Sequence, residues 1–203
     1  TAKYRLTPQI KIGMLTFGLV FICSGSFIFY NTNILNEYHR SNYWEKRSAD
    51  YERTYKKFKG IPQPKITSVR GEVHLYPKEA RVGFSGVYQM KNKSDSVIDT
   101  IHTNFNRRAP YSTFVWSQPN ETVFTDSSYG WDMFVFNPPI QPEDEFSLEF
   151  SGERKRTGFS NGGVNRTVVE NGTMIWSGDL FPTFGYNSGR ELSDKRTRKK
   201  HDL

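Results

Sequence analysis

The sequence predicts a mainly β protein, an antiparallel β-sandwich or saddle preceded by one transmembrane helix and a helical stalk. Three observations lead to this fold class. An uncharged apolar run occupies residues 12–30, a charged stretch without glycine or proline follows, and from Lys65 onward apolar and polar residues alternate with a period of two. After the apolar run, the chain of 203 residues is still long enough for one ordinary domain.

The apolar run has the length of a membrane span. At a rise of 1.5 Å per residue it covers roughly 28 Å, close to the thickness of the hydrocarbon layer. A signal peptide is one alternative, but the run leads into Asn31 without a small-x-small cleavage site. A buried core helix is another, but such helices alternate faces and this one is apolar all round. We therefore assign residues 1–35 to a transmembrane segment with a basic N-terminal flank.

Flanking charges and small residues predict the surroundings of this span. Lys11 is the charge closest to it, which favours a cytoplasmic N-terminus and an extracytoplasmic β-domain at the cell membrane. Small residues such as Gly18 and Ser24 allow close approach between helices in lipid. The predicted partners are therefore the lipid bilayer and other transmembrane helices.

Charge and cysteine content exclude other classes. The formal net charge is +7, but the basic residues are scattered and no recognition motif accompanies them, so we expect no nucleic-acid partner. The one cysteine, Cys23, lies inside the apolar run, and no intrachain disulfide can form.

Residues 36–60 are predicted to form the helical stalk. The large aromatics Trp44, Tyr51, Tyr55 and Phe58 are spaced 7, 4 and 3 apart, which places them on one helical stripe. The stalk would lie against the next domain or a partner helix; a solvated helix with aromatics near the lipid headgroups is the alternative. Gly60 and the two prolines that follow end the helix.

Residues 61–194 are predicted to form the β-sandwich. Alternation marks half-buried strands around residues 69–75, 82–90 and 146–150, and shorter strand-like runs occupy 113–116, 121–125 and 131–136. Residues 167–176 are predicted to form a hairpin with a type I′ turn at Asn171-Gly172. We expect residues 65–194 to fold alone, unless the doubly apolar run 131–136 requires an absent neighbour. Residues 195–203 form a basic tail or linker, with a disordered end, a linker and the start of a helix as open alternatives.

The histidines do not form a zinc motif. None of His39, His74, His102 and His201 is followed by glutamate, so His-Glu-x-x-His is absent. His74 and His102 fall on predicted strands and are expected on polar faces.

Two further patterns are interpreted as structural rather than functional. Residues 158–162 fit Gly-x-Ser-x-Gly, but a nucleophile elbow needs a buried strand before it and a helix after it, so a glycine-rich loop is predicted. Trp116, Trp131 and Trp176 are expected to pack in the core rather than line a carbohydrate or peptide groove. We therefore predict no catalytic residue, no cofactor-binding residue, no metal ligand and no cofactor, and expect that the chain is not an enzyme.

Several stretches match a known order of elements. They read Ile-Pro-Gln-Pro-Lys-Ile at 61–66, Val-His-Leu-Tyr-Pro at 73–77, Gly-Val-Tyr-Gln-Met-Lys-Asn-Lys-Ser at 86–94, Asn-Pro-Pro-Ile-Gln-Pro-Glu-Asp-Glu-Phe-Ser-Leu-Glu-Phe at 137–150 and Phe-Pro-Thr-Phe-Gly-Tyr at 181–186. Together they resemble bacterial membrane proteins that fuse a type-two ABC transporter permease to an aminopeptidase N-like (gluzincin) region. Asp144 stands where that family usually has glycine.

The resemblance implies that the chain covers the last membrane span and the N-terminal β-saddle domain, and ends where a peptidase domain begins. It implies a non-catalytic domain that positions a neighbouring zinc peptidase domain, or shapes access to it, within a metallo-aminopeptidase parent. The chain has neither the zinc motif nor the Gly-x-Met-x-Asn motif of that family. The alternative function is an independent cell-envelope module that binds glycan or peptide through exposed aromatics.

Overall fold

The computed structural model describes residues 7–162 and 167–203, which form two compact units. One unit holds the described residues up to 40 together with 157–162, and the other holds 41–156 and 167–203.

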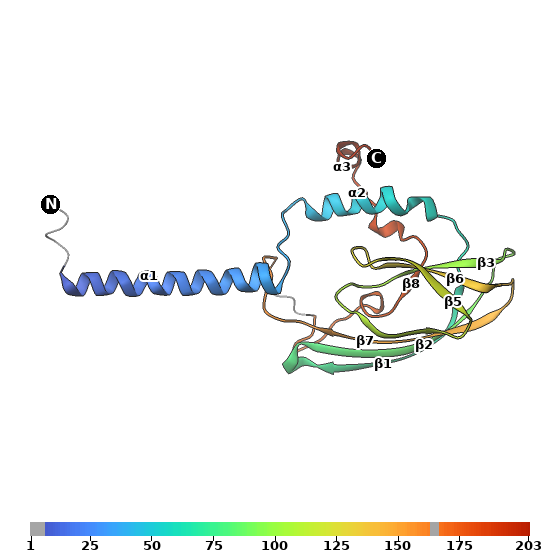
Figure 1. Ribbon diagram of the computed structural model, residues 1–203, viewed down its shortest axis with the longest axis horizontal. Coiled ribbons are helices and arrows are strands. Elements are labelled where there is room, and N and C mark those ends of the chain that lie inside the picture. Colours follow the sequence, from blue (N-terminus) through green and yellow to red (C-terminus); the bar gives the residue numbers. More distant parts are fainter. Residues whose placement is uncertain (1–6, 163–166) are drawn as a thin grey trace. The chain divides into compact units, whose positions relative to one another are not determined.

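The first unit contains the apolar helix α1, Pro8–Phe29, which continues as the π-helical stretch η2, Tyr30–Leu35 (Figure 1). Thr7 caps its beginning, because its hydroxyl accepts from the Ile10 N–H at 3.4 Å. Residues 8–35 are long and apolar enough to cross a membrane, and no residue of α1 is buried. Among the described residues this is the one helix of that kind.

The second unit contains two antiparallel four-stranded sheets, which confirms the predicted fold class. The first sheet has the order β1-β2-β7-β4, with bounds Lys65–Tyr76, Arg81–Lys91, Glu145–Lys155 and Tyr111–Trp116. The second has the order β5-β6-β3-β8, with bounds Asn120–Asp126, Trp131–Ile140, Ile98–Asn104 and Thr183–Phe184. The helices are α2 at Tyr43–Tyr55 and α3 at Lys195–Lys200, with short 3-10 turns at Lys56–Phe58 (η3), Pro77–Glu79 (η4), Ser177–Asp179 (η5) and Ser188–Arg190 (η6).

The main core lies between the two sheets. Alternate residues of β2 and β7 point inward, among them Phe84, Met90, Leu148 and Phe150. They meet inward residues of β3 and β6, including Ile101, Phe134 and Phe136. In β2 and β7 the period-two pattern thus buries one face of the strand, as the alternation predicts.

A second apolar cluster lies on the other face of the second sheet. Trp131 of β6 packs there with Tyr51 and Tyr55 of α2, and Met133 is packed against them. Figure 1 shows α2 lying over β3, β5 and β6. The doubly apolar run 131–136 is therefore covered on one face by the sandwich core and on the other by α2, from within the same chain.

Strand β1 departs from the expected burial. The predicted half-buried face of residues 69–75 is open to solvent, and every residue of β1 is exposed. The reason is position, because β1 ends the first sheet and has β2 as its one strand neighbour among the described residues.

The predicted hairpin at 167–176 is wrong. These residues contain no strand, and Asn171 does not adopt the left-handed conformation that a type I′ turn needs. Instead, the Met174 N–H donates to the Thr167 carbonyl at 3.2 Å, and Val168 and Ile175 pack against the core. The Gly172 N–H also donates to the Val169 carbonyl at 3.3 Å, so the segment forms a turn without flanking strands.

Candidate functional site

Helix α2 and the C-terminal segment, residues 185–203, meet on the outer face of the second sheet, and we call their contacts the brace. Helix α2 forms because it lacks glycine and proline. The spacing of Tyr51 and Tyr55 places both on one face of α2, and that face is buried.

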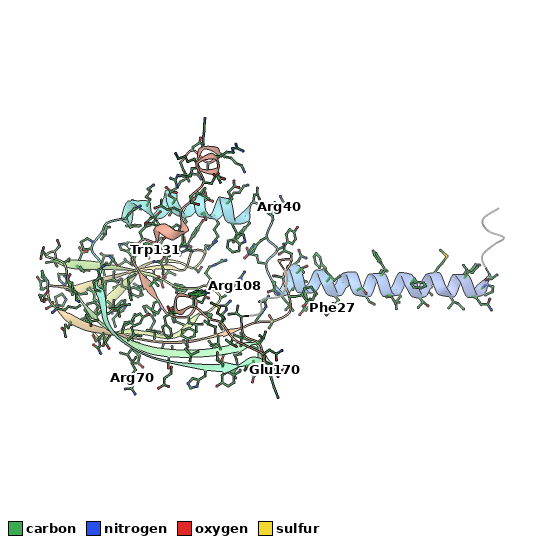
Figure 2. All side chains as sticks on the ribbon, turned by 180° about the vertical axis from the view of Figure 1, so that it is seen from behind. Phe27, Arg40, Arg70, Arg108, Trp131 and Glu170 are labelled. Atoms are coloured by element: carbon green, nitrogen blue, oxygen red, sulfur yellow. The ribbon has the colours of Figure 1, made fainter. Side chains whose placement is uncertain are left out.

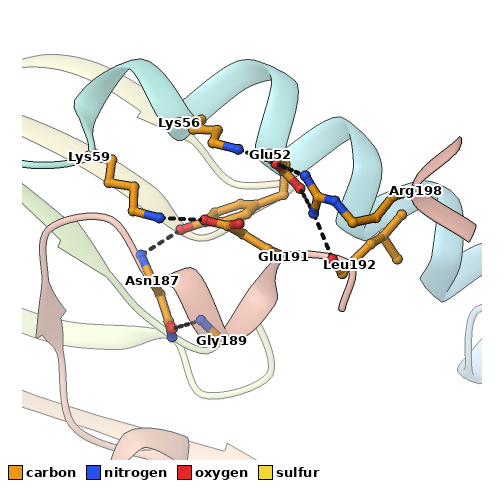
Figure 3. Close-up of polar contacts among 9 residues, drawn as sticks. Glu52, Lys56, Lys59, Asn187, Gly189, Glu191, Leu192 and Arg198 are labelled. Carbon is orange, nitrogen blue, oxygen red and sulfur yellow. Dashed lines mark hydrogen bonds and ion pairs between the residues drawn. The ribbon is translucent and has the colours of Figure 1, made fainter. Parts of the chain in front are cut away.

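Glu52 is the centre of the brace and is 1% exposed. Arg198 of α3 grips it in a bidentate pair, with Nη1 donating to Oε2 at 2.8 Å and Nη2 to Oε1 at 2.7 Å (Figure 3). Lys56, one turn along α2, donates to Oε1 at 2.5 Å. Arg198 Nη1 also donates to the Leu192 carbonyl at 2.6 Å. The hydrogen bonds from Arg198, reinforced by Lys56, lower the pKa of Glu52 to about 2.

The aromatic layer lies beneath this ion pair. The Tyr51 ring stacks on Tyr186 with centroids 5.3 Å apart, and its hydroxyl accepts from the Asn187 N–H at 3.0 Å. The Arg190 guanidinium also lies over the Tyr51 ring, with its central carbon 4.4 Å from the ring centroid. Burial raises the pKa of the Tyr51 hydroxyl above its ordinary value.

Tyr55 extends the layer onto the sheet. Its ring stacks on Trp131 at 4.5 Å between centroids, and its hydroxyl donates to Asp126. Burial, followed by the hydrogen bond to Asp126, raises the pKa of Tyr55. Figure 2 shows Trp131 lying between the sheet and α2.

Ion pairs at the surface complete the brace. Lys59 Nζ lies 3.2 Å from Glu191 Oε1, and Glu45 Oε1 lies 2.7 Å from both Lys200 Nζ and His201 Nε2. Exposed pairs of this kind contribute little individually, so the buried Glu52 contact dominates.

The segment 195–203, for which three alternatives were open, contains the short helix α3. Asp194 caps it, because its Oδ1 accepts from the Thr197 N–H at 2.8 Å. That backbone hydrogen bond, the largest cause, holds the pKa of Asp194 below its ordinary value. The cap begins α3 where Arg198 can reach Glu52.

The chemistry of the brace is structural. Glu52 is ionised at neutral pH and accepts from two cationic side chains, so it is a poor proton acceptor. Tyr51, Tyr55 and Tyr186 have raised pKa values because of burial, so their phenols stay protonated at neutral pH. These groups are suited to holding two segments of chain together, not to proton transfer.

His102 corrects a sequence expectation. It was predicted on a polar face, but it is 2% exposed and its ring lies 4.6 Å from Phe58 and 5.4 Å from Trp131 between centroids. Burial lowers its pKa, and its Nδ1 has no hydrogen-bond partner among the described residues. The cause is the covering of this sheet face by α2 and η3. His74, by contrast, is exposed on β1.

The Gly-x-Ser-x-Gly pattern forms a loop of the first unit. Asn36 Nδ2 donates to the carbonyls of Thr157 at 3.1 Å and Phe159 at 3.2 Å, and Asn161 donates to the His39 carbonyl at 2.8 Å. Gly158 is left-handed, with φ of 61°. The loop therefore closes on the chain after α1. The residues just after it, 163–166, lie outside the described part.

The tryptophans divide into two groups. Trp116 and Trp131 are buried in the two clusters, as expected, but Trp176 is 69% exposed and its predicted core position is wrong. Within residues 7–162 and 167–203, no group of three His, Cys, Asp or Glu side chains is placed to hold a metal ion.

Sequence reasoning missed the pairing of Glu52 with Arg198. The two residues are 146 positions apart, and a charged helix and a basic tail are each ordinary solvent-exposed patterns. The one available signal was the capping pattern Asp194-x-x-Thr197, which begins a helix inside the basic tail.

Comparisons with known proteins give a distant likeness. No family model matches the sequence, and no curated protein matches it. A variant of a two-domain M1 zinc metallopeptidase bound to L-tryptophan aligns with a TM-score of 0.36 and 14% identity, covering 48% of this chain and 22% of that one. An M1 zinc metallopeptidase from Deinococcus radiodurans, bound to a Tyr-Ser-Ala substrate, aligns with a TM-score of 0.34 and 12% identity, covering 58% and 30%. The chain spans less than a third of either structure.

Proposed function

We propose that the chain is the membrane-anchored, non-catalytic β-sandwich part of a bacterial membrane protein that joins an ABC permease-like region to an aminopeptidase-like region. It positions a neighbouring zinc peptidase domain, or shapes access to it. The observation that carries the proposal is the brace, in which buried Glu52 ties α2 to the C-terminal segment.

A domain that positions its neighbours has to be rigid at the segments that connect it to them. Residues 43–58 and 185–203 are the first and last parts of the second unit, and both are fixed to the same sheet face. Their contacts are a buried bidentate ion pair and stacked aromatic rings, not flexible linkers. This arrangement supports a role in holding neighbouring parts of a larger protein in register.

The apolar helix α1 supplies the anchor in this proposal. Its unburied apolar surface supports contact with the lipid bilayer and with other transmembrane helices, such as those of a permease. Lys11, the charge nearest to the span, favours a cytoplasmic N-terminus, so the proposal places the β-domain on the extracytoplasmic side.

A thiol-labelling experiment tests the orientation. Asp95 is exposed in a turn of the second unit, so Asp95→Cys in a Cys23→Ser background offers one accessible thiol. We expect a membrane-impermeant maleimide to label it in intact cells. Labelling only after permeabilisation would place the domain on the cytoplasmic side.

The coding sequence downstream of Leu203 tests the peptidase neighbour. A reading frame that continues into His-Glu-x-x-His supports the proposal, and a stop codon directly after Leu203 contradicts it. The purified chain should neither retain stoichiometric zinc nor hydrolyse aminoacyl anilides. Chelator-sensitive hydrolysis at constant specific activity through purification would overturn the non-catalytic assignment.

One observation favours the second candidate function, an independent module that binds glycan or peptide. Trp176 and Met174 are 69% and 66% exposed, and lie on either side of Ile175, which packs against the core. A binding role predicts that Trp176→Ala abolishes retention on immobilised cell-wall glycan or peptide, whereas Trp176→Phe keeps most of it. Absence of binding by the unmodified chain excludes this candidate.

A further inference from the structure

Strand β1 presents an apolar row that is about half exposed, and the Phe181 ring lies against this row at Gly71, where an added Cβ would be 2.9 Å from it. Its members Ile66, Val69, Val73 and Leu75 lie opposite residues of β2 that are buried in the core, namely Met90, Tyr88, Phe84 and Val82. Opposed residues of an antiparallel pair point to the same face, so the row lies on the inner face of the first sheet. The exposed fractions of its members are 39%, 53%, 45% and 45%.

The outer edge of β1 is also free. No second described strand pairs with it, and β1 is twelve residues long. Edge strands are usually protected by proline, inward-pointing charge, shortness or bulges. The one irregularity in β1 is near its start, at Thr67, and its inner row carries no charge. From Ser68 to Tyr76 the strand is a regular template for another strand.

The charged residues on the outer face of β1 indicate which strand would pair with its free edge. Arg70 points away from the sheet into solvent (Figure 2) and makes no ion pair within the described residues. Among the residues that the structure describes, Glu72 has one weak ion-pair partner, His74, whose Nε2 lies 3.8 Å from the Glu72 Oε2. Both side chains are therefore free to bind opposite charges across the edge.

A second copy of the same strand fits these charges in one register. An antiparallel pair centred on Gly71 places each Arg70 opposite the other copy's Glu72, and each Val69 opposite the other copy's Val73. A pair centred on Arg70 or on Glu72 instead opposes like charges. A shift by one residue puts the apolar rows on opposite faces of the joint sheet.

We infer that this chain dimerises through its β1 edges, in antiparallel register centred on Gly71. The contact is isologous, so both copies use the same surface. The two first sheets become one continuous sheet, and the apolar rows of the two copies lie side by side on its inner face.

Charge reversal tests the interface in the full chain, purified in detergent and sized by sedimentation across a concentration series. We expect Arg70→Glu and Glu72→Arg each to weaken dimerisation by about tenfold, because each creates two like-charged pairs. The double variant R70E/E72R restores opposite charges and should recover the dimer. The control Glu149→Arg reverses an exposed charge on the outer face of β7 and should leave the dimer unchanged.

A monomeric unmodified chain at every concentration overturns the inference. So does a dimer that resists both single reversals, because the interface then lies elsewhere, for example along α1.

Disulfide formation tests the register. In a Cys23→Ser background, Val69→Cys chains mixed with Val73→Cys chains should form a heterodisulfide on oxidation. Each variant alone should not, since the equivalent residues of the two copies are then roughly 13 Å apart along the strands. Cross-linking that is equally efficient in the unmixed variants, or absent from the mixture, contradicts this register.

Discussion

Glu52 on α2 and Arg198 on α3 form a bidentate ion pair across 146 positions of sequence, with N–O distances of 2.7 and 2.8 Å. Glu52 is buried, whereas the Arg198 side chain is 24% exposed. Removing Arg198 leaves a buried carboxylate with Lys56 as its remaining cationic partner. The pair therefore makes the position of α3 a condition for the stability of α2.

Arg198→Met should lower the free energy of unfolding of residues 41–203 by about 3 kcal/mol, because it leaves a buried charge without its main partner. Urea denaturation followed by circular dichroism measures this loss. Lys195→Met, an exposed change in the same helix, is the control and should have little effect. Replacing both charges, Glu52→Leu with Arg198→Met, should recover most of the loss; a single variant as stable as the unmodified chain contradicts the role of the pair.

Acid should weaken the brace in a defined window. The pKa of Glu52 is lowered from 4.5 to about 2 in the folded chain. A carboxyl whose pKa is lower in the folded chain than in the unfolded chain stabilises the fold at pH values above its unfolded-state pKa. This stabilisation is lost as the pH falls from about 5 towards 2. We expect the difference in unfolding free energy between the unmodified chain and Glu52→Gln to shrink by about 3 kcal/mol over this window. A constant difference from pH 7 to pH 3 would show that Glu52 keeps an ordinary pKa.

A fragment of residues 65–194, which the alternation alone predicts to fold by itself, should be less stable than residues 41–203 because α2 covers the run 131–136. The shorter fragment lacks α2 and α3, so it exposes Trp131, Met133 and His102 on the outer face of the second sheet. We expect it to aggregate or to bind an apolar dye, whereas the longer fragment unfolds cooperatively. Equal stability of the two fragments in urea would show that the cover is dispensable.

Gly130→Ala should destabilise the second sheet by about 2 kcal/mol, since Gly130 adopts a left-handed φ of 64° and a Cβ there would collide with the Phe105 carbonyl. The Phe105 N–H also donates to the Gly130 carbonyl at 2.9 Å, so neither strand end can move away freely. Gly178→Ala is the matched control, because its Cβ meets nothing within 4 Å and its φ is not positive. Thermal unfolding of both variants decides the comparison.

Phe21→Arg should impair membrane insertion, because a charge at the centre of a span costs about 2.5–3.5 kcal/mol. Phe21→Leu keeps the apolar character and should insert normally. Carbonate washing of membranes, followed by blotting of the pellet and supernatant, measures retention. Release of the unmodified chain by carbonate contradicts the membrane anchor itself.

Local sequence determined much of this fold. Uninterrupted apolarity from residue 12 to residue 30 predicts one long apolar helix, and α1 with η2 forms it. Alternation with a period of two predicts strands at residues 82–90 and 146–150, and both form within β2 and β7. These elements depend on the pattern of residues a few positions apart, so the local sequence is sufficient to predict them.

Only the tertiary structure decided which faces are covered. The alternation of β1 matches that of β2, yet the apolar row of β1 is exposed because β1 is the end strand of its sheet and lies at the margin of the core. The sequence places His102 on a polar face, but α2 and η3 cover it in the structure. The sequence gives no sign that Glu52 is buried, but Arg198 pairs with it in the structure. In each case burial depends on an element far away in sequence, and local periodicity carries no information about which distant element arrives.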